Sequence, residues 1–290
     1  MDVYEIVTEQ VIAALEAGTV PWHQPWNAIG GEPKSLSSRK SYRGVNTFLL
    51  STSAMTAGYD SPWWVTYKQA SERGGQVRKG EKSTLVVFWK MFKGEDKVTG
   101  KDKQIPMLRY FRVFNACQCD DLKVPAEPER REHLPIESCE TIANGYLTSD
   151  NAPSIQFGGD RACFSPSLDQ VRMPIPEAFK TAEGYYSTLF HELTHSTGSA
   201  KRLARKDLLE MHYFGDENYS REELVAEMGA AMLSGVAGID QLTVPKSAAY
   251  IESWLRGLKG DKKLVVAAAG QAQRAADLIR GIQFDKEVAA

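Results

Sequence analysis

The chain has 290 residues, of which 42% are hydrophobic and 25% are charged, and this composition is typical of a globular protein. It is long enough for two domains, each with its own core, and it contains no apolar run long enough to cross a bilayer. Four scattered cysteines exclude a disulfide framework, and the N-terminal residues lack the basic and apolar regions of a signal peptide. We therefore expect free thiols, a cytoplasmic protein and no membrane partner.

Charge is unevenly distributed along the chain, although the formal net charge is only −2. Residues 1–125 contain 17 Lys and Arg against 13 Asp and Glu, which gives this part a net charge of +4. The remaining residues contain 18 basic and 24 acidic side chains, which gives −6. Five of the six tryptophans also lie in the first part. The sequence therefore indicates a mildly basic, tryptophan-rich domain joined to an acidic one.

The first part mixes helices with strands. Apolar residues at helical spacing predict three helices, over residues 2–17, 46–57 and 66–74. β-Branched and aromatic residues predict two strands, over residues 83–90 and 108–114. The polar stretch 94–104 is expected to be a loop or hairpin tip between them. The first domain, residues 1–120, is therefore predicted to be α+β.

Prolines among charged residues predict an interdomain linker over 121–136, and they are Pro125, Pro128 and Pro135. The second domain, 137–290, is expected to be mainly helical with a small sheet. Its predicted helices cover residues 137–147, a run from 185 to Gly198, 220–233, 246–258 and 263–281. Its predicted strands cover residues 161–165 and 170–173, and we expect the first of these to lie alongside the central helix.

The most informative motif is His191-Glu192-Leu193-Thr194-His195, an HExxH sequence within the predicted helix that ends at Gly198. Residues i and i+4 share one face of a helix, so His191 and His195 can present two imidazoles to one metal ion. Glu192 then stands beside them as the predicted catalytic base. The alternative is a pair of surface histidines on an ordinary amphipathic helix.

A zinc site that contains two histidines needs a third protein ligand. The extended form of the motif would place a histidine at position 201, but this residue is Lys201. The predicted helix 220–233 carries Glu223 and Glu227 on one face. We predict that Glu223 is the third ligand and that Glu227 accepts a hydrogen bond from a ligand histidine. The reverse assignment stays open, and so does a solvated helix start without metal.

These residues predict a zinc metallopeptidase centre that binds one Zn²⁺, with Mn²⁺ as the alternative, and keeps a fourth position for water. The metal would lower the pKa of the water toward about 7, and Glu192 would pass its proton to a leaving amine. An oxyanion donor is also needed, and Arg202, Tyr213 and Tyr219 are equal candidates. Three ligands without cysteine favour an open site over a closed structural zinc site.

Basic, glycine-punctuated loops and aromatic residues in the first domain are typical of single-stranded nucleic-acid binding, in which cations contact phosphates and rings stack on bases. The candidate contacts are Trp22, Trp26, Arg39, Lys40, Tyr42, Arg43, Trp64, Tyr67, Lys68, Arg78, Lys79 and Lys82. The alternative is that the tryptophans belong to the core and the basic loops are solvated surface. A net charge of +4 is modest for a nucleic-acid-binding domain.

Seven segments of the sequence resemble the motifs of one protein family. They are Gly18–Trp22 with Pro25-Trp26, Tyr42–Asn46, Trp64–Ala70, Gly75–Glu81, Val113–Asn115, Tyr185–His195 and Glu222–Glu227. On these motifs the chain resembles, nearly from end to end, the ArdC-type antirestriction proteins carried by conjugative plasmids. The HExxH motif alone would indicate only a zincin-like protein.

The resemblance implies an N-terminal single-stranded DNA-binding domain and a C-terminal metallopeptidase-like domain similar to that of SprT/Spartan-type proteases. It implies that the protein protects incoming plasmid DNA from host restriction during conjugation. Single-stranded DNA is the expected partner, with weaker binding of duplex DNA, and the protein partner is an unidentified substrate or a host restriction enzyme. The alternatives are a DNA-binding shield with a non-hydrolytic metal site, and a general cytoplasmic metalloprotease that acts on DNA-bound proteins.

Overall fold

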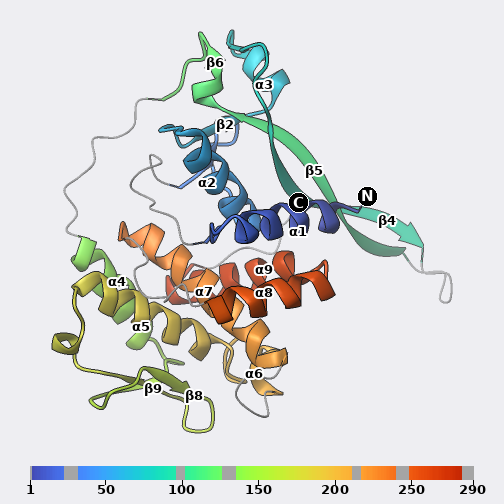
Figure 1. The fold of residues 1–290 in the computed structure, drawn as a ribbon. Helices are drawn as coiled ribbons and strands as arrows, with labels where there is room; N and C mark the ends of the chain where they lie inside the picture. The colour runs from blue at the N-terminus through green and yellow to red at the C-terminus, as the bar shows by residue number, and fades with distance from the viewer. Residues whose placement is uncertain are drawn as a thin grey trace.

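A computed structural model describes residues 2–22, 32–95, 102–125, 135–210, 217–239 and 248–282. Its helices are α1 (Val3–Glu16), α2 (Val45–Ala57), α3 (Tyr67–Glu72), α4 (Pro135–Leu147), α5 (Ala182–Thr197), α6 (Lys206–Leu209), α7 (Glu217–Ala237), α8 (Ala248–Gly260) and α9 (Leu264–Ile279), with short 3-10 turns η2 (Ala116–Gln118) and η3 (Pro176–Ala178). Its strands are β1 (Lys34–Ser35), β2 (Trp63–Val65), β3 (Gln76–Val77), β4 (Thr84–Glu95), β5 (Asp102–Asn115), β6 (Cys119–Asp120), β7 (Ser154–Phe157), β8 (Cys163–Ser165) and β9 (Gln170–Met173). The predicted α+β class is confirmed (Figure 1).

The N-terminal half is built around a sheet with the strand order β1-β2-β5-β4. Strands β4 and β5 are antiparallel and pair continuously from Thr84 opposite Val113 to Glu95 opposite Asp102. The hairpin is therefore longer than predicted, because the polar stretch 94–104 contributes strand residues at both of its ends. Figure 1 shows that it projects beyond the helices.

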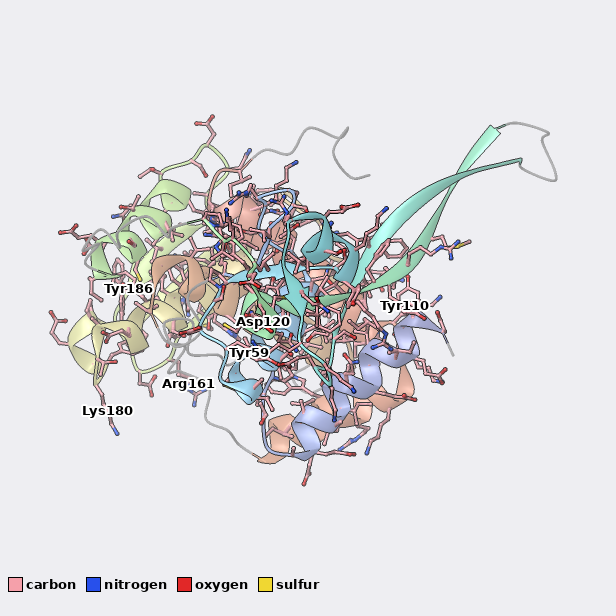
Figure 2. All side chains as sticks on the ribbon, turned by 90° about the horizontal axis from the view of Figure 1, so that it is seen from above. Tyr59, Tyr110, Asp120, Arg161, Lys180 and Tyr186 are labelled. Carbon is pink, nitrogen blue, oxygen red and sulfur yellow. The ribbon has the colours of Figure 1, made fainter. Side chains whose placement is uncertain are left out.

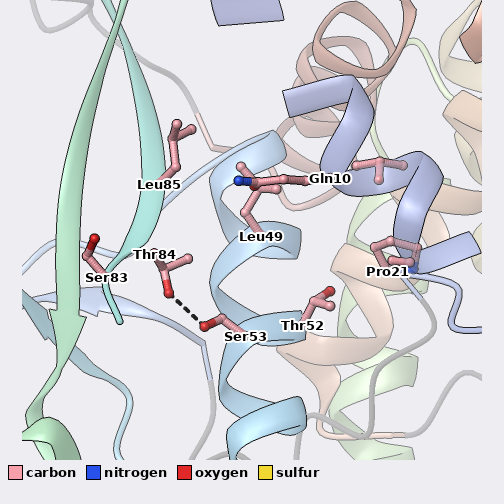
Figure 3. Close-up of a pocket in the computed structure, with 10 residues that line it drawn as sticks. Gln10, Pro21, Leu49, Thr52, Ser53, Ser83, Thr84 and Leu85 are labelled. Carbon is pink, nitrogen blue, oxygen red and sulfur yellow. Dashed lines mark hydrogen bonds between the residues drawn. The ribbon is translucent and has the colours of Figure 1, made fainter. Parts of the chain in front are cut away.

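Helix α2 packs against β4 through a side chain that imitates a neighbouring strand. Asn46 donates through Nδ2 to the carbonyl of Val87 and accepts from the Val87 N–H through Oδ1, both at 2.7 Å. This pairing satisfies backbone groups at the outer edge of the sheet, which would otherwise be open to another strand. Beside it, a cavity of about 250 Å³ lies between α1, α2 and the start of β4, where Ser53 and Thr84 share a 2.6 Å hydrogen bond (Figure 3).

In the C-terminal half, α5 and α7 lie side by side, α9 packs on both, and the sheet β7-β9-β8 covers another side of α5 (Figure 1). The predicted strands at 161–165 and 170–173 correspond to β8 and β9, and β8 contacts α5 as expected. Helices α5 and α7 approach closely at Gly229, where an added Cβ would lie 2.5 Å from Cγ2 of Thr194. Glycine therefore sets the separation of the two helices that carry the predicted metal ligands.

The two halves also pack against each other, because buried residues of both form one continuous cluster. Helix α1 packs on α8 and α9. The rings of Trp22 and Trp254 meet edge to face at 5.2 Å, and Arg43 forms an ion pair with Asp277 of α9. The two halves therefore support each other. Among the helices that the structure describes, none is long and apolar enough to cross a bilayer.

Candidate metal centre and nucleic-acid interface

Helix α5 places the two histidines of the HExxH motif on one buried face. The helix begins after Thr181, whose hydroxyl accepts a 3.1 Å hydrogen bond from the Gly184 N–H, and it is capped at Gly198 as predicted. One helical turn separates His191 from His195, so their ring centroids are 4.7 Å apart. The two Nε2 atoms are 3.1 Å apart, which directs both imidazoles at the same point.

Helix α7 brings a carboxylate to that point. Glu223 Oε2 lies 3.6 Å from His191 Nε2, and Glu223 Oε1 lies 3.3 Å from His195 Nε2. One ligand atom from each of these three residues lies within 4.8 Å of the others, and this is the one such group of histidine, cysteine and acidic residues in the described part of the chain. The geometry thus assembles two imidazole nitrogens and one carboxylate.

The opposite nitrogen of each ring is held by a different glutamate of α7. His191 Nδ1 lies 3.3 Å from Glu227 Oε1, and His195 Nδ1 lies 3.1 Å from Glu222 Oε1. Carboxylates that bind Nδ1 fix the orientation of an imidazole and leave Nε2 for a metal. Burial lowers the pKa of both histidines, but hydrogen bonds to carboxylates outweigh it. Glu223 and Glu227 raise the pKa of His191 well above its usual value, and Glu222 and Glu223 raise that of His195 to about 9.

Sequence reasoning missed the part that Glu222 plays in this network. Its carboxylate is 1% exposed and accepts hydrogen bonds from Arg205 Nε at 2.9 Å and from Arg205 Nη2 at 2.5 Å. Arg205 also donates to the hydroxyl of Thr197 and to the carbonyl of Thr194, so it ties α7 to the end of α5. The only hint in the sequence was that Glu222 is a third acidic residue, directly before Glu223. Nothing in the sequence paired it with Arg205, which lies 17 residues away.

The predicted catalytic base, Glu192, lies on the same helix and is 7% exposed. Arg202, one candidate oxyanion donor, has a 2% exposed side chain that donates to Asp169 and to the carbonyl of Ser196. It is therefore a structural residue, and its candidacy as a donor was wrong. Tyr213 and the side chain of Tyr219 lie outside what the structure describes.

Two of the predicted DNA contacts, Trp22 and Trp64, are wrong because their side chains are buried. Trp22 is fully buried against Phe48 and Trp254, and Trp64 is 1% exposed and meets Tyr59 edge to face. Neither ring has a face that a base could reach, because both were recruited into the hydrophobic core. Trp26 lies outside the described residues.

The other predicted contacts lie at or near the surface, in three separate groups. They are Arg39, Lys40, Tyr42 and Arg43 before α2, Tyr67 and Lys68 at the start of α3, and Arg78, Lys79 and Lys82 before β4. Several already have protein partners. Arg39 lies 5.4 Å from the ring centre of Trp63, and Arg78 binds Glu81 and the carbonyl of Cys117. Both cations are therefore held by contacts within the protein.

The two halves match two known protein families. Residues 1–114 match the N-terminal domain of anti-restriction factor ArdC, and residues 143–271 match a zincin-like metallopeptidase. The crystal structure of the metal-free antirestriction ArdC protein from plasmid R388 superposes with a TM-score of 0.78 at 38% identity, covering 98% of this chain and 100% of that one. The chain belongs to the ArdC family of antirestriction proteins.

Further relatives agree with this family assignment. The Mn(II)-bound structure of the R388 protein also has a TM-score of 0.78 and covers 97% of this chain. The uncharacterized protein y4eC of Sinorhizobium fredii is 38% identical over 99% of this chain and 94% of its own length. A DNA primase TraC of Escherichia coli is 35% identical over 95% of this chain, which corresponds to 20% of the primase. The family module therefore also occurs within much longer proteins that act on DNA.

Proposed function

We propose that this protein binds single-stranded DNA, and duplex DNA more weakly, and protects incoming plasmid DNA from host restriction. Membership of the ArdC family supports this role, and so does the net positive charge of residues 1–125. The occurrence of the same module within a primase is consistent with DNA as its partner. The described residues do not identify the protein substrate or the host restriction enzyme on which it acts.

We also propose that the C-terminal half holds one divalent metal, Zn²⁺ or Mn²⁺, through His191, His195 and Glu223. The observation that carries this proposal is the convergence of both Nε2 atoms on the Glu223 carboxylate, while Glu222 and Glu227 hold the opposite ring nitrogens. This donor set fits zinc and manganese, which take imidazole and carboxylate ligands. Glu227 thereby takes the role of positioning His191.

A metal held there would supply Lewis-acid activation of a water and of a substrate carbonyl. Glu192 follows His191 directly in the motif and is the base that takes the proton of the water and later donates it to the leaving amine. Glu222 and Glu227 keep both imidazoles in one orientation throughout this exchange. The resulting activity is peptide-bond hydrolysis by a metallopeptidase that DNA binding brings to its target.

Transfer of an unmodified conjugative plasmid into a restricting host tests this function. Wild type is expected to raise the number of transconjugants, and Glu192→Gln should lose peptide hydrolysis and protection while keeping metal content and DNA affinity. The exposed Glu177, replaced by Gln, is the matched control and should behave as wild type. Full protection by Glu192→Gln would show that DNA binding shields the plasmid without hydrolysis, and failure of wild type to protect would refute the antirestriction role.

A further inference from the structure

The β4–β5 hairpin exposes an unusual amount of aromatic surface. Phe88, Trp89, Tyr110 and Phe111 are between 43% and 51% exposed, and Met107 is 43% exposed. Isolated exposed apolar residues are ordinary on protein surfaces, but a contiguous group indicates a binding site. Figure 2 shows Tyr110 on this hairpin, which extends beyond the helices.

The strand register assigns these side chains to two faces. Phe88 lies opposite Arg109, and Phe111 lies opposite Val86, so Phe88, Arg109 and Phe111 share one face. On this face the rings of Phe88 and Phe111 are 5.6 Å apart, and the ring of Tyr42 follows at 6.3 Å from Phe88. Three rings therefore lie in successive contact from the loop before α2 to β5, and Arg109 lies on the same face of the hairpin.

On the opposite face of the hairpin, Trp89 meets Tyr4 of α1 edge to face at 6.2 Å. Trp89 is 46% exposed and Phe88 is 43% exposed, so exposure alone does not distinguish the two faces. Near its base the hairpin packs onto the body of the protein through both faces, because Val86 and Val87 are both buried. The face that carries Phe88 and Phe111 differs in that its rings lie in successive contact.

The positive charge of the N-terminal half is concentrated in the same hairpin. The segment from Thr84 to Asn115 contains seven Lys and Arg against three Asp and Glu. The rest of residues 1–125 contains ten of each sign, so the whole excess of +4 lies in the hairpin and its connection. Protein-docking surfaces are depleted of such charge at their centre, whereas single-stranded nucleic-acid sites combine cations with exposed rings.

We propose that the Tyr42–Phe88–Phe111 face is the single-stranded DNA site, a location that rests on the DNA binding proposed above. Bases stack on Phe88 and Phe111, and Arg109 contacts phosphate between them. The site selects single strands because the faces of bases in a duplex are already stacked. In Figures 1 and 2 the hairpin and α5 lie on different sides of the molecule, so bound DNA leaves the metal centre open.

Fluorescence anisotropy of a labelled oligothymidylate, titrated with the full chain at several salt concentrations, tests this site. Phe88→Ala and Phe111→Ala should each weaken binding by about 5- to 150-fold, which is the range for loss of one stacked base. They should leave the salt dependence unchanged. Arg109→Gln should instead lower the slope of log affinity against log salt by about 0.7, the value for one phosphate contact with a single strand.

A matched control separates this site from general effects of removing an exposed ring. Phe157 is 52% exposed on β7, in the other half of the protein. Replacing it by Ala should leave affinity within twofold of wild type. Phe111→Trp keeps a stacking surface and should bind as wild type does, and an unchanged melting temperature of Phe111→Ala would show that its loss of binding is not a folding defect.

The outcomes distinguish this inference from the proposed function. If wild type binds no single strand, the proposed DNA binding fails. If wild type binds and the Phe88→Ala/Phe111→Ala double variant binds equally, with an unchanged salt slope in Arg109→Gln, DNA binds elsewhere and the location is wrong. If the double variant keeps DNA affinity but loses plasmid protection, the face serves a protein partner, and this also overturns the inference.

Discussion

The network behind His195 yields the sharpest prediction for the metal centre. Glu222→Gln keeps the shape of the side chain but removes the negative charge that Arg205 and His195 share. The side chain of Arg205 is 4% exposed, so its charge stays buried without a counter-ion. Loss of one partner of a buried ion pair costs about 3–5 kcal/mol. The remaining bonds from Arg205 to Thr197 and Thr194 place this variant near the lower end, at roughly 3 kcal/mol.

This loss is measurable by calorimetry and by metal titration. A cost of roughly 3 kcal/mol corresponds to a fall in the melting temperature of roughly 6–12 °C. Metal affinity should fall by about 10- to 100-fold, because His195 exchanges a charged carboxylate acceptor for a neutral amide oxygen. Replacing Arg205 by Met in the Glu222→Gln background removes the orphaned charge and should recover part of the stability but not the metal affinity. The exposed Glu177→Gln is the control.

Two results would refute this reasoning. Stability of Glu222→Gln within about 0.5 kcal/mol of wild type, the scatter expected for a surface substitution, would mean that the buried ion pair contributes nothing. Unchanged metal affinity in a destabilised variant would mean that Glu222 acts on the fold alone and not on His195.

Two further predictions concern packing and pH. Gly229→Ala should push α7 away from α5, lower the free energy of unfolding by about 1–3 kcal/mol and weaken metal binding. In the control Gly145→Ala the added methyl group meets nothing within 4 Å, so thermal unfolding should show a neutral or stabilising effect. Equal effects of the two substitutions would contradict the close approach of the helices. Asp169→Asn should cost roughly 3 kcal/mol at neutral pH, the lower end of the range for a broken buried ion pair, because it leaves the charge of Arg202 buried without its counter-ion. Hydrogen bonding from Arg202 lowers the pKa of Asp169, so its contribution is fully present above the unfolded-state pKa of about 3.9 and is lost as the pH falls through the lower folded-state value. Urea unfolding from pH 3 to 7 should show the deficit of the Asn variant shrinking toward acid pH, and a constant deficit would contradict this origin.

Local patterns in the sequence predicted the helices and the arrangement of the central motif. Helical periodicity placed α1, α2 and α9 within a few residues of their observed ends. The i, i+4 spacing correctly brought His191 and His195 to one face, and the spacing on α7 correctly brought Glu223 and Glu227 toward them. These features depend on residues that are close in sequence, so a single chain is enough to infer them.

Features that depend on distant contacts could not be predicted in the same way. Trp22 resembles a surface aromatic in a proline-rich loop, but it is buried by Trp254, more than 200 residues away. Strand β4 continues into polar residues because β5 pairs with it, and polarity alone indicated a loop there. Strands β1 and β7 were not predicted, and each is defined by its pairing with a strand elsewhere in the chain, β2 and β9 respectively.

Isothermal titration of Mn(II) or Zn(II) into the metal-free chain tests the central claim that α5 and α7 together form a three-ligand metal site. We expect wild type to bind one ion. The affinity of Glu223→Gln should be at least about 100-fold weaker, because a ligand is lost. Glu227→Gln should still bind the ion, with an affinity about 10- to 100-fold weaker than that of wild type. Retention of full affinity by Glu223→Gln, with loss in Glu227→Gln, would contradict the ligand assignment, and equal affinity in all three proteins would contradict the site.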